Sequence, residues 1–158
     1  HAVCLVPEKR EERTTEGGLD VAADLERQCD FIVPLAEAGC RVSLFVAADE
    51  RQLQASAQAG AAVVELHTGA YCDFHAAGNH LAAEEELLRI ARSVRFAAEL
   101  GLEVHAGHGL SYETVSPIAA LPEVAELNIG HFLIGESVFL GLGPAIAEMR
   151  RLMQNARR

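Results

Sequence analysis

Short apolar runs alternate along this chain with segments in which apolar residues recur every three or four positions. The first pattern is typical of buried strands and the second of amphipathic helices. Strands are predicted at 2–7, 41–47, 61–66, 102–106 and 126–129. Helices are predicted at 20–38, 49–59, 81–100, 111–121, 132–140 and 144–156. Each strand is therefore followed by at least one helix.

Several places interrupt this pattern. Pro34 and Pro117 each fall inside a predicted helix and predict a kink or a break, because proline lacks the N–H that a helix interior needs. A loop is expected over 67–71, and the stretch 72–80 shows no clear periodicity, so it is expected to be irregular.

The pattern as a whole predicts an α/β fold. Near-continuous apolar strands separated by helices indicate a parallel sheet that is either covered on both faces or closed into a barrel. No low-complexity linker divides the chain, so residues 1–158 are expected to form a single domain.

The composition fits one domain with an aliphatic core, since half of the 158 residues are hydrophobic and none is Trp. No apolar stretch is long enough to cross a bilayer, and the first residues do not resemble a signal peptide. No membrane association and a cytoplasmic location are therefore expected. The four cysteines, at 4, 29, 40 and 72, form no Cys-x-x-Cys pair. They are expected to be reduced, mostly buried thiols rather than zinc ligands or disulfides.

The formal net charge of −10 argues against a nucleic-acid partner, whose phosphates need a basic surface. An anionic substrate would have to be held locally. Backbone N–H groups at a helix N-terminus can do this without a basic surface.

Candidate chemistry gathers at the ends of the predicted strands, where parallel α/β folds place their active sites. Glu65 and His67 lie in or just after the third strand and, two residues apart, point to the same side. His108 stands between two glycines after the fourth strand, and histidine can exchange protons near neutral pH. Gly130 and His131 lead from the fifth strand into a helix, the arrangement that binds phosphate in many barrels.

Each of these residues also has a structural interpretation. His108 could hydrogen-bond across a barrel mouth, Gly130 could serve a tight turn, and Glu65 could pair with an arginine. His1, His75, His80 and His105 are assigned surface or structural roles. A metal-dependent aldolase or hydrolase is a rival function, although the spacing of its four candidate ligands, Glu65, His67, His108 and His131, matches no known metal motif.

Six blocks of the sequence carry a family resemblance: 4–10 (CLVPEKR), 14–21 (TTEGGLDV), 42–45 (VSLF), 65–69 (ELHTG), 106–110 (AGHGL) and 126–131 (ELNIGH). In this order they closely resemble the pyridoxine 5′-phosphate synthase family, from end to end of the chain. The resemblance implies a (β/α)8 barrel, of which this chain covers about the last five βα units, and a homo-octamer. It also implies an enzyme of vitamin B6 biosynthesis that needs neither a metal nor an organic cofactor.

The family's reaction condenses 3-amino-2-oxopropyl phosphate with 1-deoxy-D-xylulose 5-phosphate, giving pyridoxine 5′-phosphate, inorganic phosphate and water. By resemblance, His108 corresponds to the proton donor and Glu65 to a carboxylate that stabilises the transition state. The resemblance also implies substrate contacts, from Gly109, Gly130 and His131 to the aminoketone phosphate and from Thr14 to the deoxyxylulose phosphate.

The sequence departs from the family in one large respect. The family's N-terminal third, with three strands, a further His and Glu and additional substrate contacts, has no counterpart here. Five strands alone would leave an unpaired edge on each side of the sheet. We therefore expect a truncated chain, for which His1 in place of Met is suggestive, or a partner that supplies the rest. A catalytically incomplete phosphate-binding half-barrel stays open as an alternative.

Overall fold

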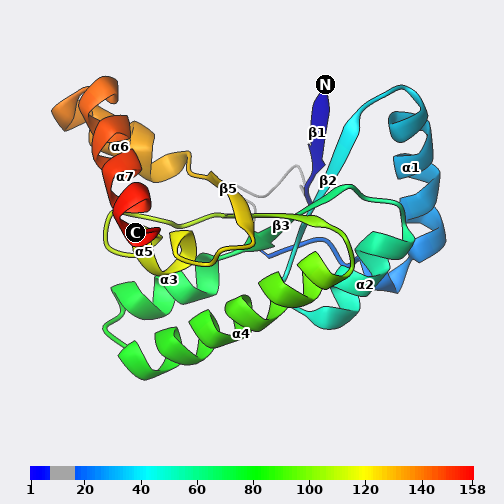
Figure 1. Cartoon of the computed structure of the whole chain (residues 1–158), viewed down its shortest axis with the longest axis horizontal. Helices are drawn as coiled ribbons and strands as arrows, with labels where there is room; N and C mark the ends of the chain where they lie inside the picture. Colours follow the sequence, from blue (N-terminus) through cyan, green and yellow to red (C-terminus); the bar gives the residue numbers. More distant parts are fainter. Residues whose placement is uncertain (8–16) are drawn as a thin grey trace.

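The computed structural model describes residues 1–7 and 17–158. Five strands form one sheet: β1 (Ala2–Leu5), β2 (Arg41–Val46), β3 (Val63–His67), β4 (Glu103–Gly107) and β5 (Val124–Asn128). Neighbouring strands are all parallel, and their order in the sheet is their order in the chain (Figure 1). The predicted α/β class with a parallel sheet is confirmed.

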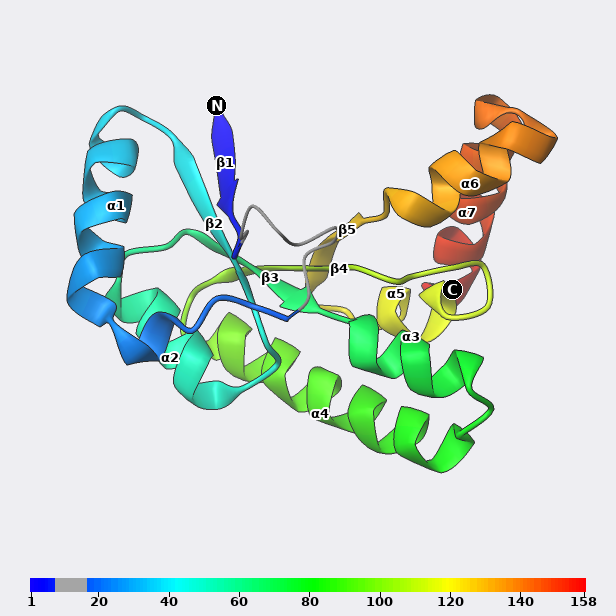
Figure 2. The ribbon, with the colours of Figure 1, turned by 180° about the vertical axis from the view of Figure 1, so that it is seen from behind.

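Helices connect the strands and extend beyond the last one: η1 (Val21–Ala23), α1 (Leu25–Glu37), α2 (Glu50–Gln58), α3 (Gly69–Ala76), α4 (His80–Glu99), α5 (Val115–Ala119), α6 (His131–Leu140) and α7 (Leu142–Ala156). Figures 1 and 2 show α2, α3 and α4 on one side of the sheet, with α6 and α7 beyond the end of β5. Asp24, Asp49 and Asn79 cap α1, α2 and α4 by accepting a backbone N–H from the first helical turn.

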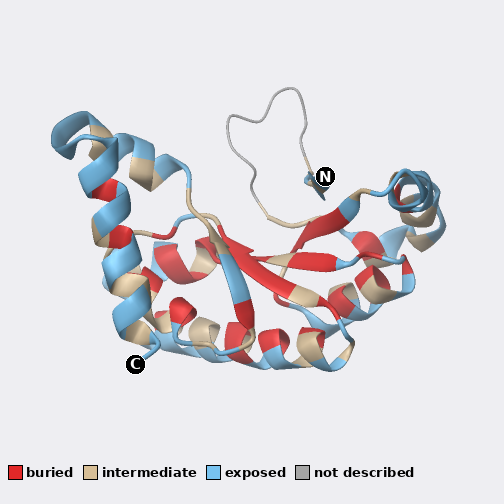
Figure 3. Ribbon diagram, turned by 45° about the horizontal axis from the view of Figure 1, so that its top comes forward, coloured by how far each residue is buried: buried red, intermediate tan, exposed pale blue. Residues whose placement is uncertain are grey.

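The two sides of the sheet have different chemistry. On the helix-facing side, Leu44, Val64, Leu66, Val104 and Ala106 are at most 1% exposed and pack against the helices in the hydrophobic core (Figure 3). The opposite side, here called the cavity-facing side, carries most of the polar residues of the strands: Cys4, Ser43, Glu65, His67, Glu103, His105, Glu126 and Asn128, with Phe45 among them. Strand alternation thus separates the core from the candidate chemistry.

The strand register aligns the cavity-facing residues across the sheet. Phe45 on β2 pairs with Glu65 on β3, which in turn pairs with His105 on β4. Between β4 and β5 the register shifts, because Val104 pairs with Val124 while His105 pairs with Glu126. This bulge places one extra residue in β5 and keeps Glu126 on the cavity-facing side.

The helix predicted over 20–38 is interrupted at a different residue from the one expected. It breaks at Asp24, whose extended backbone separates η1 from α1, whereas α1 continues through Pro34. Proline is tolerated there because the surrounding turn is exposed, so water can satisfy the carbonyl left without a partner. Pro117 is the third residue of the short α5, within the first turn, where no N–H partner is needed.

The prediction of a loop over 67–71 and of an irregular stretch over 72–80 was wrong. Residues Gly69–Ala76 form helix α3, and α4 begins only four residues after it ends. The segment lacks a clear amphipathic pattern because Tyr71 and Cys72 are buried while its exposed face includes Phe74. Hydrophobic periodicity therefore gave no signal for this helix.

The prediction that the cysteines are reduced thiols is confirmed, whereas the prediction that most of them are buried is wrong. All four cysteines are free thiols, but only Cys72 is buried, whereas Cys29 and Cys40 are partly exposed and Cys4 is exposed. Cys4 is exposed because β1 is an edge strand and its side chain lies on the cavity-facing side. Across residues 1–7 and 17–158, no helix combines the length and apolar character needed to cross a membrane.

Candidate active site

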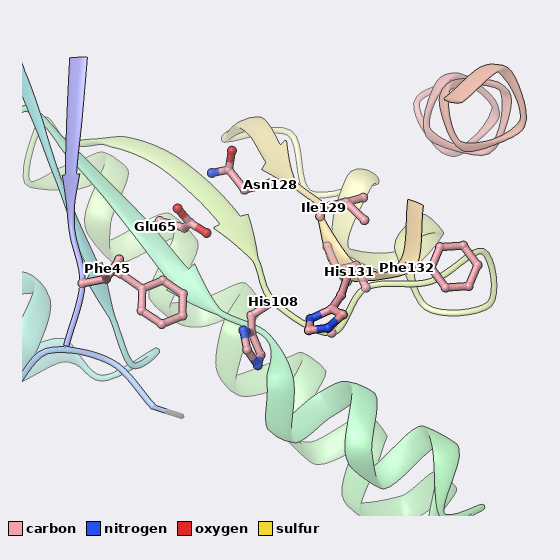
Figure 4. Close-up of a pocket in the computed structure, with 11 residues that line it drawn as sticks. Phe45, Glu65, His108, Asn128, Ile129, His131 and Phe132 are labelled. Atoms are coloured by element: carbon pink, nitrogen blue, oxygen red, sulfur yellow. The ribbon is translucent and has the colours of Figure 1, made fainter. Parts of the chain in front are cut away.

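A cavity of about 700 Å³ opens at the carboxyl ends of the strands (Figure 4). Its wall comes from five chain segments, with Val6, Phe45, Glu65, His108, Gly109, Leu110, Asn128, Ile129, Gly130, His131 and Phe132 as the lining residues. Five of the predicted site residues, Glu65, His108, Gly109, Gly130 and His131, therefore share one space. Thr14, the sixth, lies outside the described residues.

Glu65 presents a partly buried carboxylate to this cavity. Its Oε2 accepts a hydrogen bond from Cys4 Sγ at 3.7 Å. Burial raises the pKa of Glu65, while hydrogen bonding to Cys4 and Asn128 and the charge of His105 partly oppose that rise. Among the ion pairs of the described residues none involves Glu65, so the arginine pairing considered from sequence is not formed there.

His108 is held in an unusual backbone conformation. Its φ is +79°, in the left-handed region that non-glycine residues seldom adopt. Thr68, which is fully buried, stabilises this turn, since its hydroxyl lies 2.7 Å from the carbonyl oxygen of Gly107 and 2.6 Å from that of His108. Such strain persists where the surrounding structure imposes it, and it is common at functional sites.

The glycine before His108 is required by close packing. A Cβ atom at Gly107 would lie 2.6 Å from both the carbonyl oxygen of Asn128 and Oε1 of Glu65. Any side chain there would push Glu65 or β5 away from the cavity. The Gly-His-Gly motif therefore brings the carboxylate and the imidazole to the same cavity.

Gly130 and His131 form the opposite wall, at the start of α6. Gly130 is the N-cap residue of this ten-residue helix, and no side chain caps its first turn. The first N–H groups of a helix have no partner within the helix, and the helix dipole favours an anion beside them. A Cβ at Gly130 would meet no atom of residues 1–7 and 17–158 within 4 Å, so the start of α6 is open beside Gly130, which lines the cavity.

Known proteins are similar to this chain in sequence. A family model described as "Pyridoxal phosphate biosynthesis protein PdxJ" matches residues 1–155. The chain belongs to this family. Pyridoxine 5′-phosphate synthase of Roseobacter denitrificans is 67% identical over 157 residues, covering 99% of this chain and 63% of the relative. The protein of the same name from Ruegeria pomeroyi is 66% identical with the same coverage. That of Rhodospirillum rubrum is 62% identical over 158 residues, covering 100% of this chain and 62% of the relative.

This PdxJ-family chain therefore spans about 63% of the length of the curated relatives that it matches. The similarity continues through all five strands and into the last helix. The cavity and its lining thus lie entirely within the matched region.

Sequence reasoning missed several residues around Glu65 in this PdxJ-family chain, of which Phe45 and Asn128 line the cavity. Cys4, Phe45 and Asn128 each belong to a strand and have their side chains on the cavity-facing side. Their types carry little catalytic signal, and only the register shows that they flank Glu65. Alternation counted outward from Glu65 would have placed Phe45 and Asn128 on the same side once the strand pairing was known.

His105 has the structural role assigned to it from sequence. It is 6% exposed, and its Nε2 lies 2.7 Å from Glu103 Oε1, which also pairs with Arg41 at 2.5 Å. These partners lower the pKa of Glu103, the hydrogen bond from His105 most strongly. His1 and His80 are exposed, as expected, and His75 is partly exposed on α3. The polar cluster of Arg41, Glu103 and His105 fills the end of the sheet away from the cavity.

The metal-site rival receives no support from the geometry. Within residues 1–7 and 17–158, no three His, Cys, Asp or Glu side chains come together as a set that could hold a metal ion. Of the four side chains considered, His67 does not reach the cavity wall at all.

Proposed function

We propose that this chain carries part of the active site of a pyridoxine 5′-phosphate synthase. The reaction joins 3-amino-2-oxopropyl phosphate to 1-deoxy-D-xylulose 5-phosphate and yields pyridoxine 5′-phosphate, inorganic phosphate and water. One observation carries the proposal: a carboxylate, an imidazole and an open helix N-terminus share one cavity in a chain 67% identical to a protein of that name.

His108 is the proposed proton donor. Ring closure between an amine and a carbonyl compound needs an imine to form, protons to move, and phosphate and water to leave. A general acid with a pKa near neutral assists each of these steps, and histidine is the side chain best suited to it. His108 fits because its ring stands at the cavity wall on a backbone that Thr68 holds in place.

Glu65 is the proposed stabiliser of the transition state. Its carboxylate faces the same cavity, and positive charge that develops on nitrogen during imine chemistry would be stabilised by a fixed negative group nearby. Cys4 and Asn128 hold this carboxylate by hydrogen bonding, so that little reorganisation is needed during the reaction.

Main-chain N–H groups are proposed to hold the phosphate of the aminoketone. Gly109, Gly130 and His131 contribute them, the last two at the start of α6. This arrangement binds an anion by helix-terminus N–H groups and suits a chain whose formal net charge is −10. Thr14, outside the described residues, is proposed to contact the deoxyxylulose phosphate.

The rest of the proposal concerns the complete enzyme. The five parallel strands form the C-terminal part of a (β/α)8 barrel, and three further strands close the sheet between β1 and β5, its two edges. The assembled protein is a cytoplasmic homo-octamer that needs no metal or organic cofactor and binds neither nucleic acid nor membrane. The order of strands along the sheet supports the barrel, because barrels of this type also run in chain order.

The experiment supplies both phosphates to the purified chain, alone and joined to the N-terminal third of a 67% identical relative. Release of inorganic phosphate and mass detection of pyridoxine 5′-phosphate report the reaction. Product from the joined protein supports the proposal. Binding of both phosphates without turnover in either form selects the phosphate-binding half-barrel instead. Activity that chelators abolish and a divalent metal restores selects the metal-dependent rival.

A further inference from the structure

His67 lies directly behind His108, although it does not line the cavity. The ring centroids of the two histidines are 4.8 Å apart, with 38° between their planes. The edge of Phe45 closes the group, at 5.3 Å and 88° from the ring of His67. These separations are those of aromatic rings in van der Waals contact. The imidazole of His108 therefore rests against a second ring.

Gly69 leaves the space that this contact needs. A Cβ atom there would lie 2.6 Å from Cε1 and 2.7 Å from Nε2 of His67, and 3.1 Å from Cδ2 of His108. Gly69 is the first residue of α3, so the helix starts against both rings. Residues 67–69 therefore all contact the segment that carries His108. His67 contributes a ring, Thr68 a hydroxyl, and Gly69 the space that a side chain would fill.

The hydroxyl and the ring act on different parts of His108. Thr68 contacts the main-chain carbonyls of Gly107 and His108, which fixes the left-handed backbone. That interaction leaves the side-chain torsions of His108 free. The ring of His67, and more distantly that of Phe45 with its centroid at 6.3 Å, instead contacts the imidazole of His108 itself.

His67 is suited to support by packing rather than by proton exchange. Its Nε2 is shielded from solvent and has no hydrogen-bond partner in the described part of the chain. Burial is the main cause that lowers the pKa of His67, and the charge of His108 lowers it further. The other facing groups are Asp73 on α3 and Glu86 on α4, which oppose the shift, and Arg89 on α4, which adds to it. The net effect of these surroundings favours the uncharged form of the His67 ring.

We propose that His67 is a positioning residue, whose ring holds the imidazole of His108 in its orientation toward the cavity. This role rests on the proposed function of His108 as proton donor. His67 touches neither substrate nor reacting atoms, and it acts only through the ring of His108.

Two substitutions at His67 distinguish the contribution of its ring from that of its nitrogen atoms. His67→Ala removes the contact and is expected to lower kcat roughly 10- to 100-fold with KM within about twofold, because the proton donor is misoriented while the phosphate sites are intact. His67→Phe keeps a ring of similar outline and loses no hydrogen bond at Nε2, so kcat is expected to recover to within about threefold of the parent. His75→Ala, which removes a histidine from the helix α3 that follows β3, is the matched control and is expected to keep full activity.

Two kinetic results would overturn the proposal. One is an unchanged kcat in His67→Ala. The other is a folded His67→Phe variant, judged by thermal unfolding, that is as slow as His67→Ala, since the nitrogens would then be needed directly. If His67→Ala does not fold, the His67→Phe variant alone decides.

A second measurement does not depend on turnover. Proton NMR of the histidine rings in the chain is expected to show that the ring signals of His108 move in His67→Ala and stay near their parent positions in His67→Phe and His75→Ala. The titration midpoint of His67 is expected below the ordinary histidine pKa of 6.5, and to rise in His108→Asn as the charge of His108 is removed. Unmoved His108 signals in His67→Ala would disprove the contact. Failure to make pyridoxine 5′-phosphate would instead count against the proposed function and leave this measurement valid.

Discussion

The two sides of β3 have opposite chemistry. Val64 and Leu66 point to the helices and are 0% exposed, packed among aliphatic side chains from α2 and α4. Glu65 and His67 alternate with them and point to the other side, where one has a raised pKa and the other a lowered pKa because of burial. Neighbouring residues of a single strand thus serve stability on one side and chemistry on the other.

Groups whose arrangement is unfavourable for folding lie on the cavity-facing side of the sheet. The helix-facing side has apolar contacts throughout, which is the expected source of folding free energy. The cavity-facing side holds a partly buried carboxylate, an unpartnered ring nitrogen and a left-handed histidine, each of which is unfavourable for folding. Unfavourable features that gather around one cavity indicate a site selected for activity.

The largest expected effect follows from removing the proposed proton donor. His108→Asn keeps a polar side chain that tolerates the left-handed backbone, so the fold is expected to survive. It is expected to lower kcat by roughly 10²- to 10⁴-fold with little change in KM for either phosphate. Steady-state kinetics check this. A kcat equal to that of the parent would remove His108 from the mechanism.

The next largest effect tests whether the two sides of β3 have separate roles in stability and activity. Leu66→Ala opens a cavity in the core and is expected to lower the free energy of unfolding by about 2–5 kcal/mol, with kcat changed little in the fraction that stays folded. Glu65→Gln, one residue away, is expected to do the reverse, with a large loss of kcat and a stability close to the parent. Urea unfolding and kinetics on both variants measure the contrast. Equal losses of stability would show that the two sides are not distinct.

A smaller effect is expected at the start of α6. Gly130→Val adds bulk in front of the open N–H groups, where no atom of the described chain interferes with a Cβ, so the fold is expected to be kept. KM for 3-amino-2-oxopropyl phosphate is expected to rise about tenfold through loss of anion contacts. Gly135→Val, at a similarly open glycine in the same helix, is the control and is expected to leave KM unchanged. A normal KM in Gly130→Val would place the phosphate elsewhere.

The smallest effect is a pH dependence of stability. Because the folded protein raises the pKa of Glu65 above its ordinary value of 4.5, the stability linked to this group is present below that value and is lost as the pH rises through the folded pKa. Glu65→Gln removes this loss. Its thermal midpoint is expected to exceed that of the parent by about 1–3 °C at pH 7.5, and the gain is expected to vanish near pH 4. Calorimetry at the two pH values checks both the gain and its disappearance. A gain in thermal midpoint that is the same at both pH values would show that it arises from packing and not from the ionisation of Glu65.

Much of the fold could be predicted from apolar periodicity alone. All five strands and helices α2, α4 and α7 were found within a few residues, because each of them places apolar residues against the core. Helix α3 was missed, since burial of Tyr71 and Cys72 beside an exposed Phe74 erases that periodicity. The break at Asp24 was also missed, because its carboxylate caps the start of a new helix, α1, while Pro34 seemed the stronger signal for an interruption.

The site was predictable to the extent that glycine and histidine mark strand ends. His108, Gly109, Gly130 and His131 were found in this way, and Glu65 from the cost of burying a charge. Cys4 and Asn128 were not, because their position beside Glu65 depends on which strands pair and in which register. The contact between His67 and His108 depends on the gap at Gly69, which no local pattern reveals.

The most direct test of the account is a crystal structure of the protein, joined to the N-terminal third of a relative, with 3-amino-2-oxopropyl phosphate bound. The account predicts the phosphate against the main-chain N–H groups of Gly130 and His131, with the His108 imidazole and the Glu65 carboxylate facing the amine and carbonyl carbons. Phosphate bound away from α6, or an imidazole turned from the ligand in the parent protein, would contradict it.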